Sequence, residues 1–94
     1  MKLTDHFDSR GKGMCVREGG SLTVTKFLTT SLQECKRKCF IDTTCAAFST
    51  DPNDSDCLIY QRSNGETCES VVIESDSDLT SSFSCYKRRC GKRL

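Results

Sequence analysis

The sequence is poor in the residues that build large cores and common catalytic sites. It has no tryptophan, one histidine (His6) and one proline (Pro52), and apolar residues make up 35% of its 94 residues. A chain of this length forms one domain, and so few apolar residues predict a small core. No apolar run approaches the roughly 20 residues that a membrane-spanning helix needs, so we expect no transmembrane segment.

The single histidine also argues against catalysis and metal binding. A cysteine nucleophile needs a free thiol beside a positioned base, and a structural zinc site needs tight cysteine pairs such as C-x2-C. The closest pair here, Cys35 and Cys39, is C-x3-C. The acidic stretch at 51–56 lacks the glycine and glutamate spacing of an EF-hand calcium loop. The sequence therefore predicts no enzyme activity, no metal and no cofactor.

What the sequence has instead is cysteine. An even number of cysteines in a short chain is typical of a small domain held together by disulfides in an oxidising compartment. The eight are Cys15, Cys35, Cys39, Cys45, Cys57, Cys68, Cys85 and Cys90. We expect a secreted or extracellular protein, with a secretory organelle as its location before release. Because residues 1–8 lack the apolar stretch of a signal peptide, we expect a mature or excised fragment, one module of a larger multi-domain protein.

Charge is segregated along the chain although the formal net charge is only +1. Residues 1–41 carry eight basic and four acidic side chains, residues 42–78 nine acidic and one basic, and residues 79–94 five basic and none acidic. Such segregation gives a polarised surface if the fold keeps these segments apart. The last basic cluster fits sulfated glycans or anionic membranes, and equally a linker, a processing site or a solubilising tail.

Local patterns predict one helix and several short strands. Ser31 and Glu34 form a capping box, which starts a helix of about ten residues that ends at residue 40 or 41. Cys35 and Cys39 are four residues apart, so their sulfurs share one face of this helix. Strands are predicted at 15–17, 22–27, 45–49, 57–60, 71–73 and 82–86.

Turn composition and polarity set the expected domain limits. The turn at 51–56 joins two of the strands into a hairpin. It also contains a glycosylation sequon at Asn53, which turn formation explains equally well. We expect a flexible leader at 1–13, the domain at 14–90 and a basic tail at 91–94, with the chain exposed from Lys87 onward.

Three stretches of the sequence together follow one pattern. They are Ser31-Leu32-Gln33-Glu34-Cys35-x3-Cys39-x5-Cys45-x2-Phe48, then Cys57-Leu58-Ile59-Tyr60, and finally Phe83-Ser84-Cys85. In this pattern the chain resembles the PAN/apple family, over residues 15–86. That family includes apple domains of plasma prekallikrein and coagulation factor eleven, the amino-terminal domain of plasminogen, and microneme adhesins of apicomplexan parasites. The near-absence of proline and the Ser/Thr/Asp-rich loops are closest in style to the microneme adhesins.

The resemblance implies a fold and a disulfide pairing. The fold is α+β, a small disulfide-rich PAN/apple fold in which one α-helix packs on an antiparallel β-sheet. The implied bridges are Cys15–Cys85, Cys35–Cys57 and Cys39–Cys45. Cys68 and Cys90 lie outside the six-cysteine pattern. They either pair with each other, which is the expected arrangement, or remain free to join a partner chain.

The function that the resemblance implies is binding. We expect an extracellular adhesive module that recognises protein or carbohydrate ligands at a cell surface, for example in host-cell attachment. Aromatic and basic residues near predicted strand ends are the candidate ligand contacts: Tyr60, Arg62, Tyr86 and Arg88.

Two alternatives remain open. One is binding of heparin or other sulfated glycans through the basic C-terminal segment, with Lys87, Arg88, Arg89, Lys92 and Arg93 as contacts. The other is a protein–protein interaction module of a secreted protease or multi-domain protein. Nucleic acid is not an expected partner, because the cysteines indicate an extracellular environment.

Overall fold

One helix and seven strands make up the described part of the chain. The computed structural model describes residues 6–17, 22–28, 31–51, 55–76 and 82–90. The elements are β1 (Phe7–Lys12), β2 (Cys15–Arg17), β3 (Thr23–Leu28), α1 (Leu32–Ile41), β4 (Cys45–Asp51), β5 (Asp56–Gln61), β6 (Ile73–Ser75) and β7 (Ser84–Arg88). The predicted α+β class, with one helix packed on an antiparallel sheet, is confirmed. No helix within these ranges is long and apolar enough to span a membrane.

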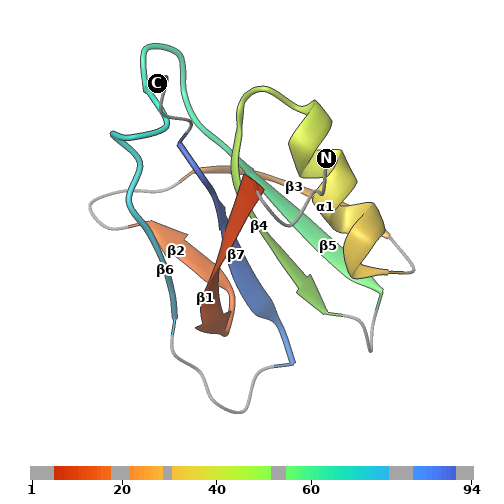
Figure 1. Cartoon of the computed structure of the whole chain (residues 1–94). Coiled ribbons are helices and arrows are strands. Elements are labelled where there is room, and N and C mark those ends of the chain that lie inside the picture. The colour runs from red at the N-terminus through yellow and green to blue at the C-terminus, as the bar shows by residue number, and fades with distance from the viewer. Residues whose placement is uncertain (1–5, 18–21, 29–30, 52–54, 77–81, 91–94) are drawn as a thin grey trace.

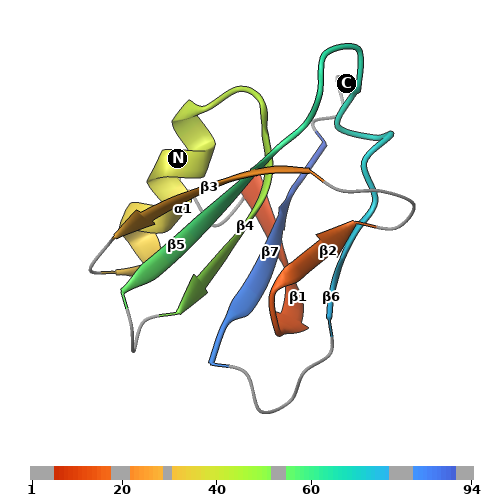
Figure 2. The ribbon, with the colours of Figure 1, turned by 180° about the vertical axis from the view of Figure 1, so that it is seen from behind.

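A five-stranded antiparallel sheet forms the centre of the domain (Figures 1 and 2). Its strand order is β1-β7-β4-β5-β3, and β2 and β6 pair separately as a short antiparallel ribbon. The expected hairpin is β4–β5, in which Phe48 lies opposite Ile59 and Asp51 opposite Asp56. All seven residues of β4 are buried, because both faces of this central strand are covered.

The two faces of the sheet carry two separate apolar clusters. Alternate side chains of a strand point to opposite faces, so Phe48 and Ile59 meet the helix while Ala47 and Tyr60 point away from it. Helix α1 packs on the first face around Cys35, Cys39, Phe7, Phe48 and Ile59. The β2–β6 ribbon covers the second face, where Val71 and Ile73 are 2% and 1% exposed. The small core is thus divided into two thin layers.

Helix α1 begins where the sequence predicts. Ser31 is its N-cap, and the Ser31 hydroxyl accepts a hydrogen bond from the Glu34 amide at 3.1 Å. Cys35 and Cys39 are fully buried on the sheet side, whereas Arg37 is exposed. The predicted burial face is therefore confirmed.

Four disulfides join these elements, and their pairing agrees with the sequence-based expectation. Cys35–Cys57 fixes α1 to β5, and Cys39–Cys45 fixes its C-terminal turn to the start of β4. Cys15–Cys85 joins the ribbon to β7. Cys68–Cys90 ties the segment between β5 and β6 to the residues after β7.

The leader predicted at 1–13 is wrong for residues 7–12, which form β1. This strand pairs with β7 from Phe7 opposite Arg88 to Lys12 opposite Ser84. The cause is Phe7, which is 5% exposed and packs edge-on against Phe48 at 5.0 Å between ring centroids. The register shifts between Ser9 and Gly11, where Gly11 takes a φ of 101° that favours glycine. Because this stretch is polar and its register is irregular, its sequence has no alternating apolar pattern that would predict a strand.

The C-terminal boundary also differs from the expectation. The strands predicted at 71–73 and 82–86 lie two residues later, as β6 and β7. Lys87 and Arg88 therefore belong to the sheet and not to an exposed tail. The sequon at Asn53 and the tail expected at 91–94 lie outside the described residues.

Removing the helix cap tests the start of α1. Ser31→Ala leaves the Glu34 amide without its side-chain acceptor and should lower the free energy of unfolding by about 1 kcal/mol. Urea unfolding of the oxidised protein measures this loss. Ser31→Asp, which keeps a capping oxygen, should stay close to wild type. Equal midpoints for wild type and Ser31→Ala would contradict the assigned helix start.

Candidate functional site

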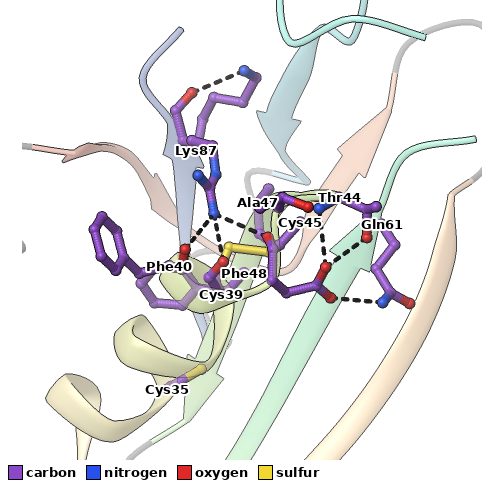
Figure 3. Close-up of a disulfide and its surroundings, with 12 residues drawn as sticks. Cys35, Cys39, Phe40, Thr44, Cys45, Ala47, Phe48, Gln61 and Lys87 are labelled. Atoms are coloured by element: carbon purple, nitrogen blue, oxygen red, sulfur yellow. Dashed lines mark hydrogen bonds between the residues drawn. A yellow bond between two sulfur atoms is a disulfide. The ribbon is translucent and has the colours of Figure 1, made fainter. Parts of the chain in front are cut away.

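Arg88 lies against the C-terminal end of α1. Its Nη2 donates hydrogen bonds to the Phe40 carbonyl at 3.2 Å, the Asp42 carbonyl at 3.1 Å and the Cys39 carbonyl (Figure 3). The last carbonyls of a helix lack intrahelical partners and carry partial negative charge. Arg88, from the far end of the chain, therefore caps the helix. Arg88, a candidate ligand contact, thus forms hydrogen bonds within the domain.

The burial of Arg88 has an electrostatic cost. Burial lowers the pKa of Arg88, the nearby Arg62 cation lowers it further, and Asp42 raises it. The Nε atom is buried without a hydrogen-bond partner. The planar guanidinium suits this place because it reaches several carbonyls at once, which a lysine ammonium on a thin stem does less well.

Asp42 also forms hydrogen bonds at the C-terminal end of α1, through its side chain. Its carboxylate accepts from the Thr44 amide at 2.9 Å, the Thr44 hydroxyl at 2.7 Å and the Gln61 amide nitrogen at 2.7 Å (Figure 3). Burial opposes the charge, but the hydrogen bonds from Thr44 and Gln61 and the Arg88 cation outweigh it, so the pKa of Asp42 lies below its usual range. The turn between α1 and β4 is thus held by a polar network beside the Cys39–Cys45 bridge.

The structure does not bring the four candidate ligand contacts together on one surface. Tyr60 is 6% exposed, and its hydroxyl accepts from Ser49 at 3.0 Å. Burial also raises the pKa of Tyr60, while the hydrogen bond from Ser49 opposes this rise. Tyr86 is half-buried on the helix side, stacked on Phe48 at 5.0 Å.

Arg62 is the remaining member of that set. It is half-buried and donates to the Thr43 carbonyl at 2.9 Å and the Glu66 carbonyl at 3.1 Å. Tyr60 and Tyr86 lie on opposite faces of the sheet. The aromatic and basic residues near strand ends pack against other residues or form turns. Their position near strand ends therefore does not identify a binding pocket.

The basic segment is also divided by the sheet. Lys87 is 6% exposed and Arg88 is half-buried, whereas Arg89 is exposed and forms an ion pair with Asp8 at 2.7 Å. Lys92 and Arg93 lie outside the described residues. Alternation along β7 turns Lys87 inward, so the run of cations does not form one continuous patch.

Strand β3 is one of the two edge strands of the five-stranded sheet, and β1 is the other. Strand β3 pairs with β5, with Thr25 opposite Ile59 and Leu28 opposite Asp56. Val24 is 48% exposed, Phe27 36% and Leu28 77%. The sequence predicted this strand but not its place at an edge, because strand order depends on long-range pairing.

Two lysines flank this edge. Lys26 is 60% exposed and lies 3.5 Å from the Asp56 carboxylate. Lys38, from α1, lies over the Phe27 ring at 4.6 Å from its centroid. Val24, Lys26 and Leu28 share the face away from the helix, and Phe27 lies on the helix side. The edge therefore offers apolar side chains, positive charge and the outer polar groups of a strand backbone.

Comparison of the sequence with protein-family models and with curated proteins finds no match. The PAN/apple resemblance thus stays a prediction from the residue pattern. Within the described residues, no group of three or more His, Cys, Asp and Glu side chains is placed to hold a metal ion.

Replacing Arg88 tests its capping role. Arg88→Met removes the donor to three helix carbonyls and should lower the free energy of unfolding by about 2 kcal/mol. Arg88→Lys should recover only part of this loss. The matched control is Arg89→Met, which breaks an exposed ion pair and should cost less than about 1 kcal/mol. Urea unfolding of the three variants gives the comparison. Equal losses at Arg88 and Arg89 would contradict the capping role.

The hydrogen-bond network of the Asp42 carboxylate can be tested by its pH dependence. The pKa of Asp42 is lower in the folded than in the unfolded protein, so its stabilising effect is present above the unfolded pKa near 3.8 and is lost as the pH falls through the folded pKa. Asp42→Asn should be less stable than wild type at neutral pH, and the gap should close in strong acid. Urea midpoints of both proteins across acidic pH measure the gap. A gap that is constant with pH would show that the charge does not matter.

Proposed function

We propose that this chain is an extracellular adhesive module of the PAN/apple type, and that it binds a protein partner by adding an extended segment of that partner to strand β3. The observation that carries the proposal is the exposure of Val24 and Leu28 on an edge strand of six residues. Natural proteins usually protect such edges, so an open and partly apolar one marks a place for strand addition. The disulfides support an extracellular location.

The positive charges beside β3 indicate which kind of partner segment it binds. Lys26 projects from the middle of β3, and Lys38 lies over Phe27 beside it. Lys26 lies within 4 Å of Asp56 but stays largely exposed, so it remains accessible to a carboxylate on an added strand. We therefore expect an acidic segment in which apolar side chains alternate with Asp or Glu, since cross-strand pairs of opposite charge are favourable.

A rigid frame favours this mode of binding. Strand addition gives affinity through main-chain hydrogen bonds, which need a fixed edge. Behind β3, Cys57 of β5 is bonded to Cys35 of the helix, and β5 pairs on its other side with the buried β4. The template strand is thus attached to the most constrained part of the domain, which reduces the ordering cost of binding.

The sulfated-glycan alternative has less support. Of the five cations on which it depends, Lys87 points inward, Arg88 caps the helix and Arg89 is in an ion pair with Asp8. Binding of a neutral sugar has no cluster of the four candidate contacts to support it. Both alternatives are outcomes of the test below.

Selection from a library of linear peptides tests the proposal. The oxidised domain should enrich extended acidic peptides with alternating apolar residues. Lys26→Glu and Leu28→Glu should each abolish their binding with little change in stability, because both side chains are exposed. Val72→Glu introduces the same charge at an exposed apolar position just before β6 and should bind like wild type.

The other outcomes identify the site differently. Peptides that bind all variants equally would exclude β3 as the binding edge. If no peptide is enriched, a glycan array read at low and high salt decides between the alternatives. Salt-resistant binding to a neutral sugar would replace the proposal with a lectin function, and binding only to sulfated glycans that is lost at high salt would replace it with polyanion binding.

A further inference from the structure

The four disulfides have different surroundings. Cys35, Cys39, Cys45, Cys57 and Cys85 are fully buried and Cys15 is 5% exposed, so three bridges lie inside the two apolar clusters. Cys68 and Cys90 are half-buried and lie outside both clusters. Thiol–disulfide exchange requires a thiolate to reach a sulfur atom. Access therefore favours attack at Cys68–Cys90.

A lysine ammonium lies directly against this bridge. Lys87 Nζ is 3.6 Å from Cys68 Sγ and 3.5 Å from Cys90 Sγ, and it donates to the Arg88 carbonyl at 3.0 Å. Lys87 is only 6% exposed, so the contact is held inside the fold and is not a chance position of a solvated side chain. Among the described lysines, Lys36 and Lys87 are buried, and Lys87 lies beside the most accessible disulfide.

Other charged groups around Lys87 shape this environment. Burial lowers the pKa of Lys87, Arg10 and Arg88 lower it further, and Glu69 and Asp8 raise it. In its ammonium form, Lys87 places a positive charge beside both sulfurs. A neighbouring cation lowers the pKa of a thiol, and a thiol of lower pKa leaves a disulfide faster.

We propose that Cys68–Cys90 is an exchangeable disulfide that a low-molecular-weight monothiol opens, with Lys87 stabilising the thiolate that leaves. The monothiolate attacks one sulfur of the bridge. The bond between Cys68 and Cys90 breaks, a mixed disulfide forms at the attacked cysteine, and the other cysteine leaves as a thiolate. Because Lys87 contacts both sulfurs, it stabilises the leaving thiolate whichever cysteine is attacked.

A second monothiolate completes the reduction. It attacks the monothiol sulfur of the mixed disulfide, releases the second cysteine as a thiolate and forms the disulfide of the monothiol. Two monothiols are oxidised and one protein disulfide is reduced, so electrons and atoms balance. Stopping after the first step leaves the domain covalently modified at Cys68 or Cys90.

The domain keeps its other stabilising contacts when the Cys68–Cys90 bridge opens. The segment between β5 and β6 keeps the Arg17–Glu66 ion pair, a hydrogen bond from the Ser63 amide to Glu66 at 2.7 Å, and the buried Val71. The remaining three bridges hold the helix, the sheet and the ribbon. Opening therefore releases the residues that follow β7 from this segment without unfolding the domain.

Reduced glutathione applied to the folded, oxidised protein tests the proposal. Thiols are blocked with iodoacetamide at successive times, and unreduced peptides are mapped by mass spectrometry. Cys68 and Cys90 should become modified about tenfold or more faster than the other six cysteines, and mixed disulfides should occur at these two positions. Simultaneous opening of all four bridges, or earlier opening of Cys15–Cys85, would overturn the proposal.

Variants separate the role of Lys87 from simple access. Lys87→Gln should slow the opening about fivefold and raise the pKa of the released thiols, read from the pH profile of their alkylation. The matched control is Lys36→Met, at the other buried lysine, which is 4% exposed and lies near Tyr86. It should leave both the rate and the pH profile unchanged. An unchanged thiol pH profile in Lys87→Gln would overturn the role of the ammonium.

A double variant keeps the test decisive if Lys87→Gln fails to fold. Cys68→Ser combined with Cys90→Ser should still fold with its three other bridges intact. If this double variant cannot fold, the bridge is required for structure and the proposal is wrong.

Discussion

The covalent attachment of one short helix to the two central strands is the constraint on which the other features depend. Cys35 and Cys39 share one face of α1, and their partners Cys57 and Cys45 lie on β5 and β4. A ten-residue helix is marginal by itself in water, and the chain has few apolar residues with which to hold it. Two bridges one turn apart fix both its position and its rotation, so Phe48 and Ile59 can pack beneath it. Arg88 then adds hydrogen bonds to the carbonyls at the C-terminal end of the helix, beside the Cys39–Cys45 bridge.

Division of the core into two layers explains why charged groups are buried in so small a domain. Each face of the sheet has a single thin cover, so side chains near the margins reach polar groups within a few ångströms. Lys87 reaches carbonyls and sulfurs at the edge of the ribbon side, and Arg88 reaches the helix end on the other side. Adjacent residues of one strand thus serve two separate layers. Among the described residues, Val24 and Leu28 of β3 remain exposed, on the strand to which we propose that the partner binds.

Local and covalent features could be predicted from the sequence, and long-range placement could not. Ser31 and the spacing of Cys35 and Cys39 define the helix, because capping and helical periodicity act within a few residues. The PAN/apple resemblance supplied the three core bridges, and the two remaining cysteines pair. β1 was missed because its only apolar anchor is Phe7, in a polar stretch with an irregular register at Gly11. The inward turn of Lys87 and the edge position of β3 depend on strand order and on where β7 ends, neither of which has a local signal.

The pairing of the first strand with the last has a mechanical consequence. Phe7 lies opposite Arg88, so the two ends of the described domain leave from the same end of one strand pair. Force applied through flanking chain would peel β1 from β7 one hydrogen bond at a time, which resists less than shearing all of them together. Peeling stops at the Cys15–Cys85 bridge, because the chain between these residues cannot lengthen while that bond is intact. Under tension the module would yield early by a short, fixed length, while the helix and the β3 edge keep their shape.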